Sequence, residues 1–385
     1  MQYKNNIIGK ILTPINRRKF KRFVKKYNGD FATKKLSTWE QFIAILLGQL
    51  TNCSSLREIE STVKFHANEH YHLGLRGNVA RSTLANANER RDWRIFRDVC
   101  FDIINNLSLF EKLETENLVK LIDSSPIRLD LANHSWAEKT QRIEGIKLHL
   151  MYDLSNSVPT YFEFSGARTN DIEIGKKMDI QKGSTYVFDK GYMDFNWWND
   201  IDEQGAYFVT RLKRNNAIVE LSELQTNNEL VSSQLIRLKN KRLTHSGKNS
   251  CREKILKRVI VQREGKTPLI LVTNDLNRSS EEIAELYKQR WQIELFFKWI
   301  KQNLKIKKFL GRSENAIKTQ ICIAIIAFVL LRLMKKLQAF CKDIPLKTII
   351  TIAKNGLFTK LSVKKYSKKN SNAFKQLHFN LVMND

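Results

Sequence analysis

The hydrophobic pattern changes its period along the chain. Up to about residue 110, apolar positions recur every three or four residues, as in the segment 17–26, where Phe20, Phe23 and Val24 share one helical face. From residue 118 apolar residues form short runs bounded by turn residues, which is typical of strands. The helical period returns after about residue 280. The pattern therefore predicts helical regions on either side of an α/β core.

Capping signals support the helices of the N-terminal region. Ser37 stands three residues before Glu40, and Ser55 three residues before Glu58, and both pairs have the spacing of a capping box ahead of an apolar run. The segment 82–104 predicts one further helix. We therefore expect a compact all-helical domain over residues 1–110.

The order of the elements in the middle of the chain predicts a mixed sheet. Strands are expected at 118–123, 145–154, 160–165, 185–189 and 206–213, and short helices at 171–178 and 195–203. Three neighbouring strands, then helix, strand, helix and strand, is the order of an RNase H-like core, here over residues 111–310. A mostly β insertion at about 215–278 contains two strands around the turn 263–266.

The segment 281–310 predicts a single helix of about twenty-five residues, because it lacks glycine and proline and follows the N-cap candidates Ser279 and Ser280. At about 100° per residue its side chains form two stripes. The polar stripe spans an arc of roughly 60° and consists of Tyr287, Arg290, Glu294 and Lys301, and the apolar stripe consists of Leu286, Ile293, Phe297, Ile300 and Leu304. The polar stripe therefore lies at the rim of the core. The alternative to a functional role is that Arg290 and Glu294 form only a solvent-exposed salt bridge along the helix.

The net charge of the chain indicates which kind of partner it binds. The chain has 385 residues with 66 Lys and Arg against 39 Asp and Glu, a formal net charge of +27, while 42% apolar content fits a globular protein. Such an excess implies a polyanion, with nucleic acid the first candidate and an anionic membrane surface the second. The segment 17–26 carries seven basic residues, and the basic C-terminal segment 311–385 ends with several lysines. For both, solvation is the alternative to DNA contact.

The cysteine spacing and the apolar runs argue against zinc-binding, disulfide-bonded, secreted and membrane-spanning proteins. Cys53, Cys100, Cys251, Cys322 and Cys341 form no C-x2-C pair, so the sequence predicts neither a zinc site nor a disulfide framework, and a reducing cytosol fits. The N-terminus lacks the apolar region of a signal peptide. The apolar run Ile321–Leu331 is shorter than the ~20 residues of a membrane span, and we interpret it as a buried core helix.

Two acids follow apolar strands. Asp123 ends the first expected strand and Asp189 a later one, so both are expected in the crevice at the strand ends. Each alone is more often a turn or cap residue. Together with Glu294 they supply the hard oxygen ligands that Mg²⁺ prefers, and two such ions can stabilise both oxygens of a phosphodiester displacement. The acids Asp130, Asp153 and Asp179 lack a matching context and are interpreted as structural.

The arrangement Tyr-x2-Arg-x3-Glu-x6-Lys at 287–301 resembles the signature helix of one branch of the DDE transposases of bacterial insertion sequences. The run 189–192 is similar to that family's Asp-x-Gly-aromatic pattern. The resemblance covers about 118–310 and implies that Asp123, Asp189 and Glu294 bind two Mg²⁺ ions, which Mn²⁺ can replace. It also implies that Tyr287, Arg290 and Lys301 contact DNA phosphates, with Arg211 as a further candidate.

The resemblance implies a cytoplasmic transposase that cleaves the ends of its own element and joins the 3′-OH to target DNA. Its expected partners are the terminal inverted repeats, the target DNA and a second copy of the chain on DNA, with no membrane. A nuclease of the same fold and a non-catalytic DNA-binding protein remain alternatives. One departure is that no Trp lies between Trp198 and Trp291, where some relatives stack a flipped base. A hairpin route would need Phe or Tyr to stack the base instead, so the choice between a hairpin and another excision route stays open.

Overall fold

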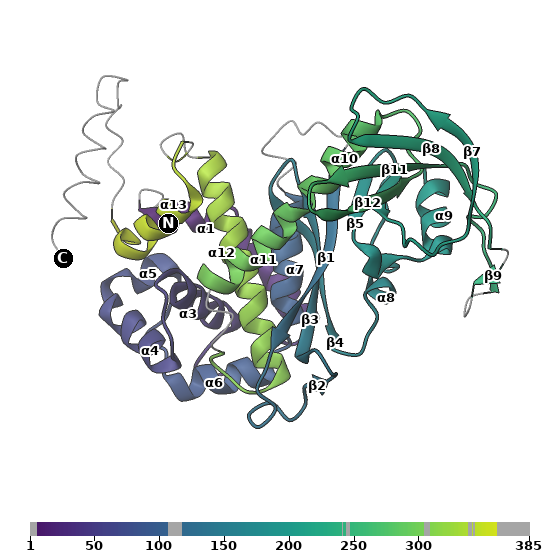
Figure 1. The fold of residues 1–385 in the computed structure, drawn as a ribbon. Coiled ribbons are helices and arrows are strands. Elements are labelled where there is room, and N and C mark those ends of the chain that lie inside the picture. Colours follow the sequence, from purple (N-terminus) through teal and green to yellow (C-terminus); the bar gives the residue numbers. More distant parts are fainter. Residues whose placement is uncertain are drawn as a thin grey trace, which may run out of the picture.

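The computed structural model describes residues 6–106, 118–240, 242–243, 247–303, 309–337, 341 and 343–359. Helices from both ends of the chain gather on one side, and one large sheet occupies the other (Figure 1). The long helix α12 stands between the N-terminal helices and the sheet. The three predicted regions therefore form one continuous body.

The N-terminal region is helical, as predicted. Its helices are α1 (Ile7–Leu12), α2 (Arg17–Lys26), α3 (Thr38–Leu50), α4 (Leu56–Phe65), the 3₁₀ turn η1 (Ala67–Glu69), α5 (His70–Leu73), α6 (Arg81–Arg90) and α7 (Arg94–Asn105). Ser37 and Glu40 form the expected capping box. Ser55 caps α4, but the Glu58 carboxylate accepts from Ser54 N at 2.6 Å instead of completing the second box.

The single helix expected over 82–104 is wrong, because α6 and α7 are separate. Arg91 adopts an extended backbone at the end of α6 (φ −79°, ψ 128°). Its buried guanidinium donates from Nε to the carbonyl of Gly29 at 2.9 Å and from Nη1 to Gln41 Oε1 at 3.1 Å. Arg91 therefore ties the α6–α7 corner to the preceding helices.

The sheet has the mixed order predicted for its core. The strands are β1 (Val119–Arg128), β3 (Glu144–Asp153), β4 (Val158–Gly166), β5 (Thr185–Phe188) and β6 (Tyr207–Arg211), in the order β4-β3-β1-β5-β6. The short β2 (Glu138–Lys139) also pairs with β3. β1 is antiparallel to β3 and parallel to β5, and β5 is parallel to β6. The connecting helices are α8 (Asp171–Gly175), shorter than expected, and α9 (Phe195–Glu203), as expected.

The inserted strands extend the same sheet. They are β7 (Ile218–Leu224), β8 (Val231–Leu238), β11 (Leu256–Arg263) and β12 (Lys266–Thr273), and β12 pairs with β6. The short β9 (Arg242–Leu243) and β10 (Gly247–Lys248) form a separate ribbon. The β11–β12 hairpin closes at the predicted turn, where Arg263 faces Lys266 and Gly265 adopts a φ of 62° that favours glycine.

The single helix expected from residue 281 is wrong in one respect, because it divides at Arg290 into α10 (Ser280–Gln289) and α11 (Trp291–Asn303). Arg290 N bonds to the carbonyl of Tyr287 and Ile293 N to that of Arg290, both three residues back. This 3₁₀-like tightening separates the two helices. Ser279 forms a capping box with Glu282 at the start of α10. Leu304 lies outside the described residues.

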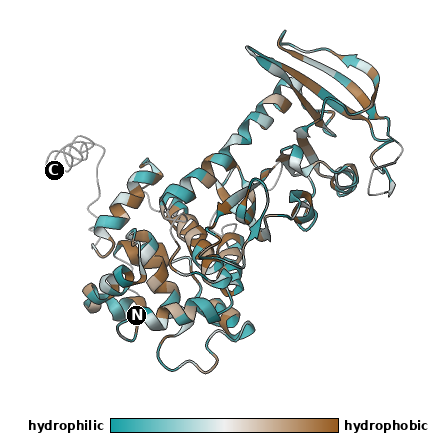
Figure 2. Ribbon diagram, turned by 60° about the horizontal axis from the view of Figure 1, so that its bottom comes forward, coloured by the Kyte–Doolittle hydropathy of each residue, from teal (hydrophilic) through white to brown (hydrophobic). Residues whose placement is uncertain are grey.

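The core runs through α12 (Glu314–Leu337), and α13 (Leu346–Gly356) packs beside it. Buried side chains of the N-terminal helices, of α11 and α12 and of one sheet face belong to one hydrophobic cluster. In Figure 2 the hydrophobic colour is dense among the helices at the centre of the molecule. The N-terminal helices and the sheet are therefore joined by a shared core.

The apolar run Ile321–Leu331 is buried inside α12, as predicted. The helix itself is longer than the run, since polar residues extend it at both ends. Among the described helices, the stretch Glu314–Lys336 alone is long and apolar enough to cross a membrane, but 89% of its most apolar window is buried inside the protein. This burial is what a core helix requires.

Candidate active site

Strand register brings the first two acids together. β1 and β5 run parallel, and their last paired residues are Ile122 and Phe188. Asp123 and Asp189 are the next residues on strands that lie about 4.8 Å apart. The expectation that Asp123 ends its strand is wrong, because β1 continues to Arg128 through its pairing with β3. Asp123 instead marks the point where β1 leaves β5, so its largely buried side chain lies at the edge where the β1–β5 pairing ends.

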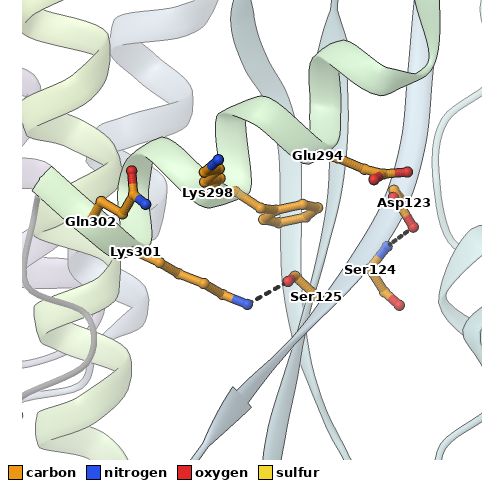
Figure 3. A pocket seen from close by; sticks show the side chains of 8 residues that line it. Asp123, Ser124, Ser125, Glu294, Lys298, Lys301 and Gln302 are labelled. Carbon is orange, nitrogen blue, oxygen red and sulfur yellow. Dashed lines mark hydrogen bonds between the residues drawn. The ribbon is translucent and has the colours of Figure 1, made fainter. Parts of the chain in front are cut away.

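Helix α11 brings the third acid to the same edge. It packs across β1, and Figure 3 shows Glu294 pointing from the helix toward Asp123 on the strand. Arg290 links the two acids, because Nη2 donates to Glu294 Oε1 at 2.5 Å and Nη1 to Asp123 Oδ2 at 3.2 Å. The pair Arg290 and Glu294 is therefore not a solvated helix salt bridge. It is part of a contact between the helix and the sheet.

Asp123 is in a strongly acidic environment. Burial of the carboxyl is the main cause that raises its pKa, and the charges of Asp189 and Glu294 raise it further. Arg290 and the backbone N–H of Ser124, which donates to Oδ1 at 2.8 Å, oppose the shift and leave the pKa at about 7. Burial of Asp123 therefore outweighs the stabilisation of its carboxylate by Arg290.

Asp189 is fixed by its own turn. Its Oδ1 accepts from Gly191 N at 2.7 Å, which caps the 3₁₀ turn η3 (Lys190–Tyr192). A Cβ at position 191 would lie 2.9 Å from that same oxygen. The glycine of the Asp-x-Gly-aromatic run is therefore required for close approach of the carboxylate to the backbone.

Lys301 contacts strand β1 two and three residues beyond Asp123. Its Nζ donates to Ser125 Oγ at 2.7 Å and to the carbonyl of Pro126 at 2.8 Å (Figure 3). A pocket of about 440 Å³ opens between α11 and β1. Its lining consists of Asp123, Ser124, Ser125, Glu294, Phe297, Lys298, Lys301 and Gln302. Asp123, Glu294 and Lys301 thus face one cavity.

Tyr287 and Arg211 lie on the other flank of Arg290. The Tyr287 side chain is buried, and its ring centroid is 5.7 Å from the Arg290 guanidinium carbon. Burial raises the pKa of Tyr287, while the positive charges of Arg290 and Arg211 oppose the rise. Arg211 ends β6, next to the strand that carries Asp189. All four predicted DNA-contact residues therefore surround the acids.

The three carboxylates are the type of ligand that a hard divalent ion prefers. All three acids offer carboxylate oxygens, which Mg²⁺ and Mn²⁺ prefer, and their charges act together on Asp123. Their present spacing is wider than a bound ion requires, since no three Asp, Glu, His or Cys side chains within the described ranges converge on a single metal position. The Arg290 guanidinium lies between Asp123 and Glu294 instead.

The remaining acids lie elsewhere. Asp153 Oδ1 accepts from Asn156 N at 3.0 Å, and Asp130 Oδ1 accepts from Ala132 N at 3.0 Å, so both cap turns. Asp179 is exposed on the surface. These contacts fit the structural roles expected of them.

Sequence reasoning missed a polar cluster beside the acids. Asp171 at the start of α8 accepts from Lys147 Nζ at 2.9 Å and from Ser124 Oγ at 3.0 Å. His149 is fully buried, with Nδ1 4.0 Å from the Asp171 carboxylate. A signal was present, since Lys147 and His149 stand two residues apart, on one face of an otherwise apolar strand.

Helix α2 presents an unpaired basic face. Phe20 and Val24 are buried, whereas the exposed Arg18, Lys21, Arg22 and Lys25 make no ion pair within the described parts of the chain. By contrast, Lys19 and Lys26 pair with acids of α7. The face is therefore available to phosphate groups.

Comparison with known proteins identifies the family. Residues 114–330 match the transposase DDE domain, and residues 3–76 match a domain of unknown function, DUF4372. The Sinorhizobium fredii protein named "Putative transposase y4zB" is 38% identical over 262 residues, which are 66% of this chain and 71% of that protein. The Synechocystis protein named "Putative transposase for insertion sequence element IS4SA" is 27% identical over 82% of this chain and 88% of its own length.

A solved structure shares the fold. The piggyBac transposase synaptic complex with hairpin DNA, determined by cryo-electron microscopy, superposes with a TM-score of 0.52 at 10% identity, covering 99% of this chain and 86% of that one. The DDE domain match covers more than half of the 385 residues and includes all three acids at the β1–β5–α11 edge. The chain therefore belongs to the DDE transposases and is a DNA transposase of the bacterial insertion-sequence type.

Proposed function

We propose that this transposase cleaves the ends of its own insertion sequence and joins the 3′-OH ends to target DNA, with Asp123, Asp189 and Glu294 as its catalytic acids. One observation carries the proposal. The parallel register that ends at Ile122 and Phe188 sets two of the acids side by side, and Arg290 connects one of them to the third.

Asp123, Asp189 and Glu294 would hold two Mg²⁺ ions, which Mn²⁺ can replace. When bound, such ions stabilise the attacking and departing oxygens of a phosphodiester displacement. The role of this chain is to orient the acids: Ser124 N fixes one oxygen of Asp123, and Gly191 N fixes one oxygen of Asp189. Ca²⁺, which tolerates looser geometry, would support DNA binding with little cleavage.

The cations of the polar stripe would contact the phosphates of the element end. Arginine can hold a phosphate through two parallel hydrogen bonds, and lysine supplies a point charge. Arg290, Lys301 and Arg211 supply positive charge around the acids, and the Tyr287 hydroxyl is next to Arg290. On this basis the chain belongs to the branch with the Tyr-x2-Arg-x3-Glu-x6-Lys signature.

The other parts of the chain would bind DNA and support assembly of two copies on it. Residues 1–110 would recognise the terminal inverted repeats, with the basic face of α2 on the DNA backbone, and residues 111–310 would carry the chemistry. The basic C-terminal segment 311–385 would follow; it contains α12 and α13, and its lysines after residue 359 lie outside the described residues. Two copies would assemble on DNA in the cytoplasm, at the nucleoid. The excess of 66 basic over 39 acidic residues supports a DNA partner.

Metal-dependent strand breakage tests the proposal. The protein is incubated with DNA that carries the flanking inverted repeats, with Mg²⁺ or with chelator, and the breaks are mapped on a denaturing gel that also resolves hairpin ends. Breaks at the element ends and strand transfer in Mg²⁺ alone are expected. Breaks scattered along the DNA would indicate a nuclease of the same fold, and equal binding without breakage would indicate a non-catalytic DNA-binding protein.

A further inference from the structure

Asp171 contacts the segments that carry two of the proposed catalytic acids. Its Oδ2 accepts from Ser124 Oγ at 3.0 Å, and Ser124 directly follows Asp123. The same oxygen lies 3.5 Å from where a Cβ on Gly191 would stand, and Gly191 N is the donor that fixes Asp189. A single carboxylate thus bonds to Ser124 on β1 and lies close to Gly191 after β5.

The carboxylate is itself held firmly. Lys147 Nζ donates to Asp171 Oδ1 at 2.9 Å and to the carbonyl of Thr169 at 2.7 Å, and only 13% of the Lys147 side chain is exposed. His149 is near but contributes no charge at neutral pH, because burial lowers its pKa to about 4. Lys147 is therefore the counterion of Asp171.

Ser124 transmits the position of Asp171 to Asp123. Its hydroxyl donates to Asp171, and its backbone N–H donates to Asp123 Oδ1 at 2.8 Å. The other oxygen of Asp123 accepts from Arg290. Rotation of the Ser124 side chain alone does not move its N–H, so Asp171 acts on Asp123 by holding the backbone of Ser124 in place. A shift of that backbone would weaken one of the two hydrogen bonds that orient the Asp123 carboxylate.

We propose that Asp171 is a positioning residue of the metal centre, which fixes the orientation of Asp123 through the Ser124 hydroxyl. The inference rests on the proposed function, because it assumes that Asp123 binds metal. Partners that orient metal ligands typically change metal affinity by ~10–100-fold when they are removed. The effect of Asp171 should depend on hydrogen-bond acceptance by its side chain.

The test is a titration of the full-length protein with Mn²⁺, in which free ion is measured by electron paramagnetic resonance without any cleavage assay. Asp171→Ala should raise the dissociation constant about tenfold. Asp171→Asn keeps an acceptor for Ser124 and should restore most of the affinity. Ser124→Ala should reproduce the loss, and the double variant Asp171→Ala with Ser124→Ala should be no weaker than either alone, since both act on one contact.

Thermal unfolding of each variant separates positioning from general destabilisation. Asp202→Ala is the matched control, because Asp202 also pairs with one lysine, Lys254, at 2.7 Å on a different part of the core. This control should lose stability without losing Mn²⁺ affinity. If Asp171→Asn were as weak as Asp171→Ala, or if the Asp171 and Ser124 effects multiplied, the inference would be overturned. If instead Asp123→Asn left Mn²⁺ binding unchanged, the proposed metal centre itself would fail.

Discussion

The guanidinium of Arg290 and the carboxylate of Asp123 meet at 3.2 Å although 167 residues separate them in sequence. The same guanidinium reaches Glu294 at 2.5 Å. The contact fixes helix α11 over strand β1, and it partly neutralises acids whose charges repel one another. Arg290 therefore has a structural role in the free protein besides its proposed contact with DNA.

Replacing Arg290 with lysine should destabilise the protein, because one ammonium group cannot span both carboxylates as the planar guanidinium does. Hydrogen bonds to charged groups contribute about 1.5–3 kcal/mol each, so Arg290→Lys should lower the free energy of unfolding by about 1–3 kcal/mol. Denaturant unfolding measures the change. Arg94→Lys, at a surface pair with Asp92, is the control and should change little. If Arg290→Lys lost no more stability than Arg94→Lys, the structural role of Arg290 would be contradicted.

Lys301→Ala should weaken binding of all element-end sequences alike and lower the slope of log K against log salt by ~1, since a phosphate-bound lysine releases about one counterion. Salt-dependent binding titrations measure both quantities. Lys288→Ala is the control, because Lys288 is exposed and pairs with Glu285 on the same helix. If Lys301 served only to hold Ser125 and Pro126, its removal would lower stability and leave the salt slope equal to that of the control.

The basic face of α2 should contribute to recognition of the element ends. Replacing Lys21 and Lys25 together with glutamine should reduce the salt slope by about 2 and weaken binding, because both are exposed and neither is paired within the described chain. The double replacement of Lys347 and Lys354 on α13 with glutamine is the matched control. Equal binding by the two double variants would exclude α2 from the interface.

Glu40 should make stability depend on pH in the acidic range. Burial raises its pKa, but hydrogen bonds from Arg76 and Ser37 outweigh this and bring the pKa down to about 2. A depressed pKa in the folded state stabilises the protein above the unfolded value near 4.5 and loses this effect as the pH falls toward 2. Thermal unfolding of wild type and Glu40→Gln should therefore differ at pH 7 and converge near pH 2. A constant difference across this range would contradict the assignment.

The local sequence pattern predicted the helices and strands well, but it predicted the contacts between them poorly. The basic helix at 17–26, the helix at 195–203 and the hairpin at 263–266 formed as expected, because periodicity, caps and turn residues are local signals. The breaks at Arg91 and Arg290 were missed, since each depends on a side chain that reaches a distant segment. Such contacts are not encoded in helical propensity.

The same limit applies to the candidate site. The signature spacing indicated Arg290, Glu294 and Lys301, but not that Lys301 would bond to Ser125 or that Arg290 would lie between two acids. Those contacts follow from the packing of α11 on β1. Asp171 was missed because its importance depends on the register of β1 and β3, which places Ser124 opposite His149.

The most direct measurement of the central claim compares cleavage and binding in three single variants. Asp123→Asn, Asp189→Asn and Glu294→Gln each remove a proposed metal ligand and no proposed phosphate contact, so each should abolish Mg²⁺-dependent breaks at the element ends. Binding of the same DNA in Ca²⁺ should remain largely intact, and Asp153→Asn, an acid that caps a turn, should still cleave. A variant that binds normally and keeps more than a few per cent of wild-type cleavage would contradict the assignment of that acid.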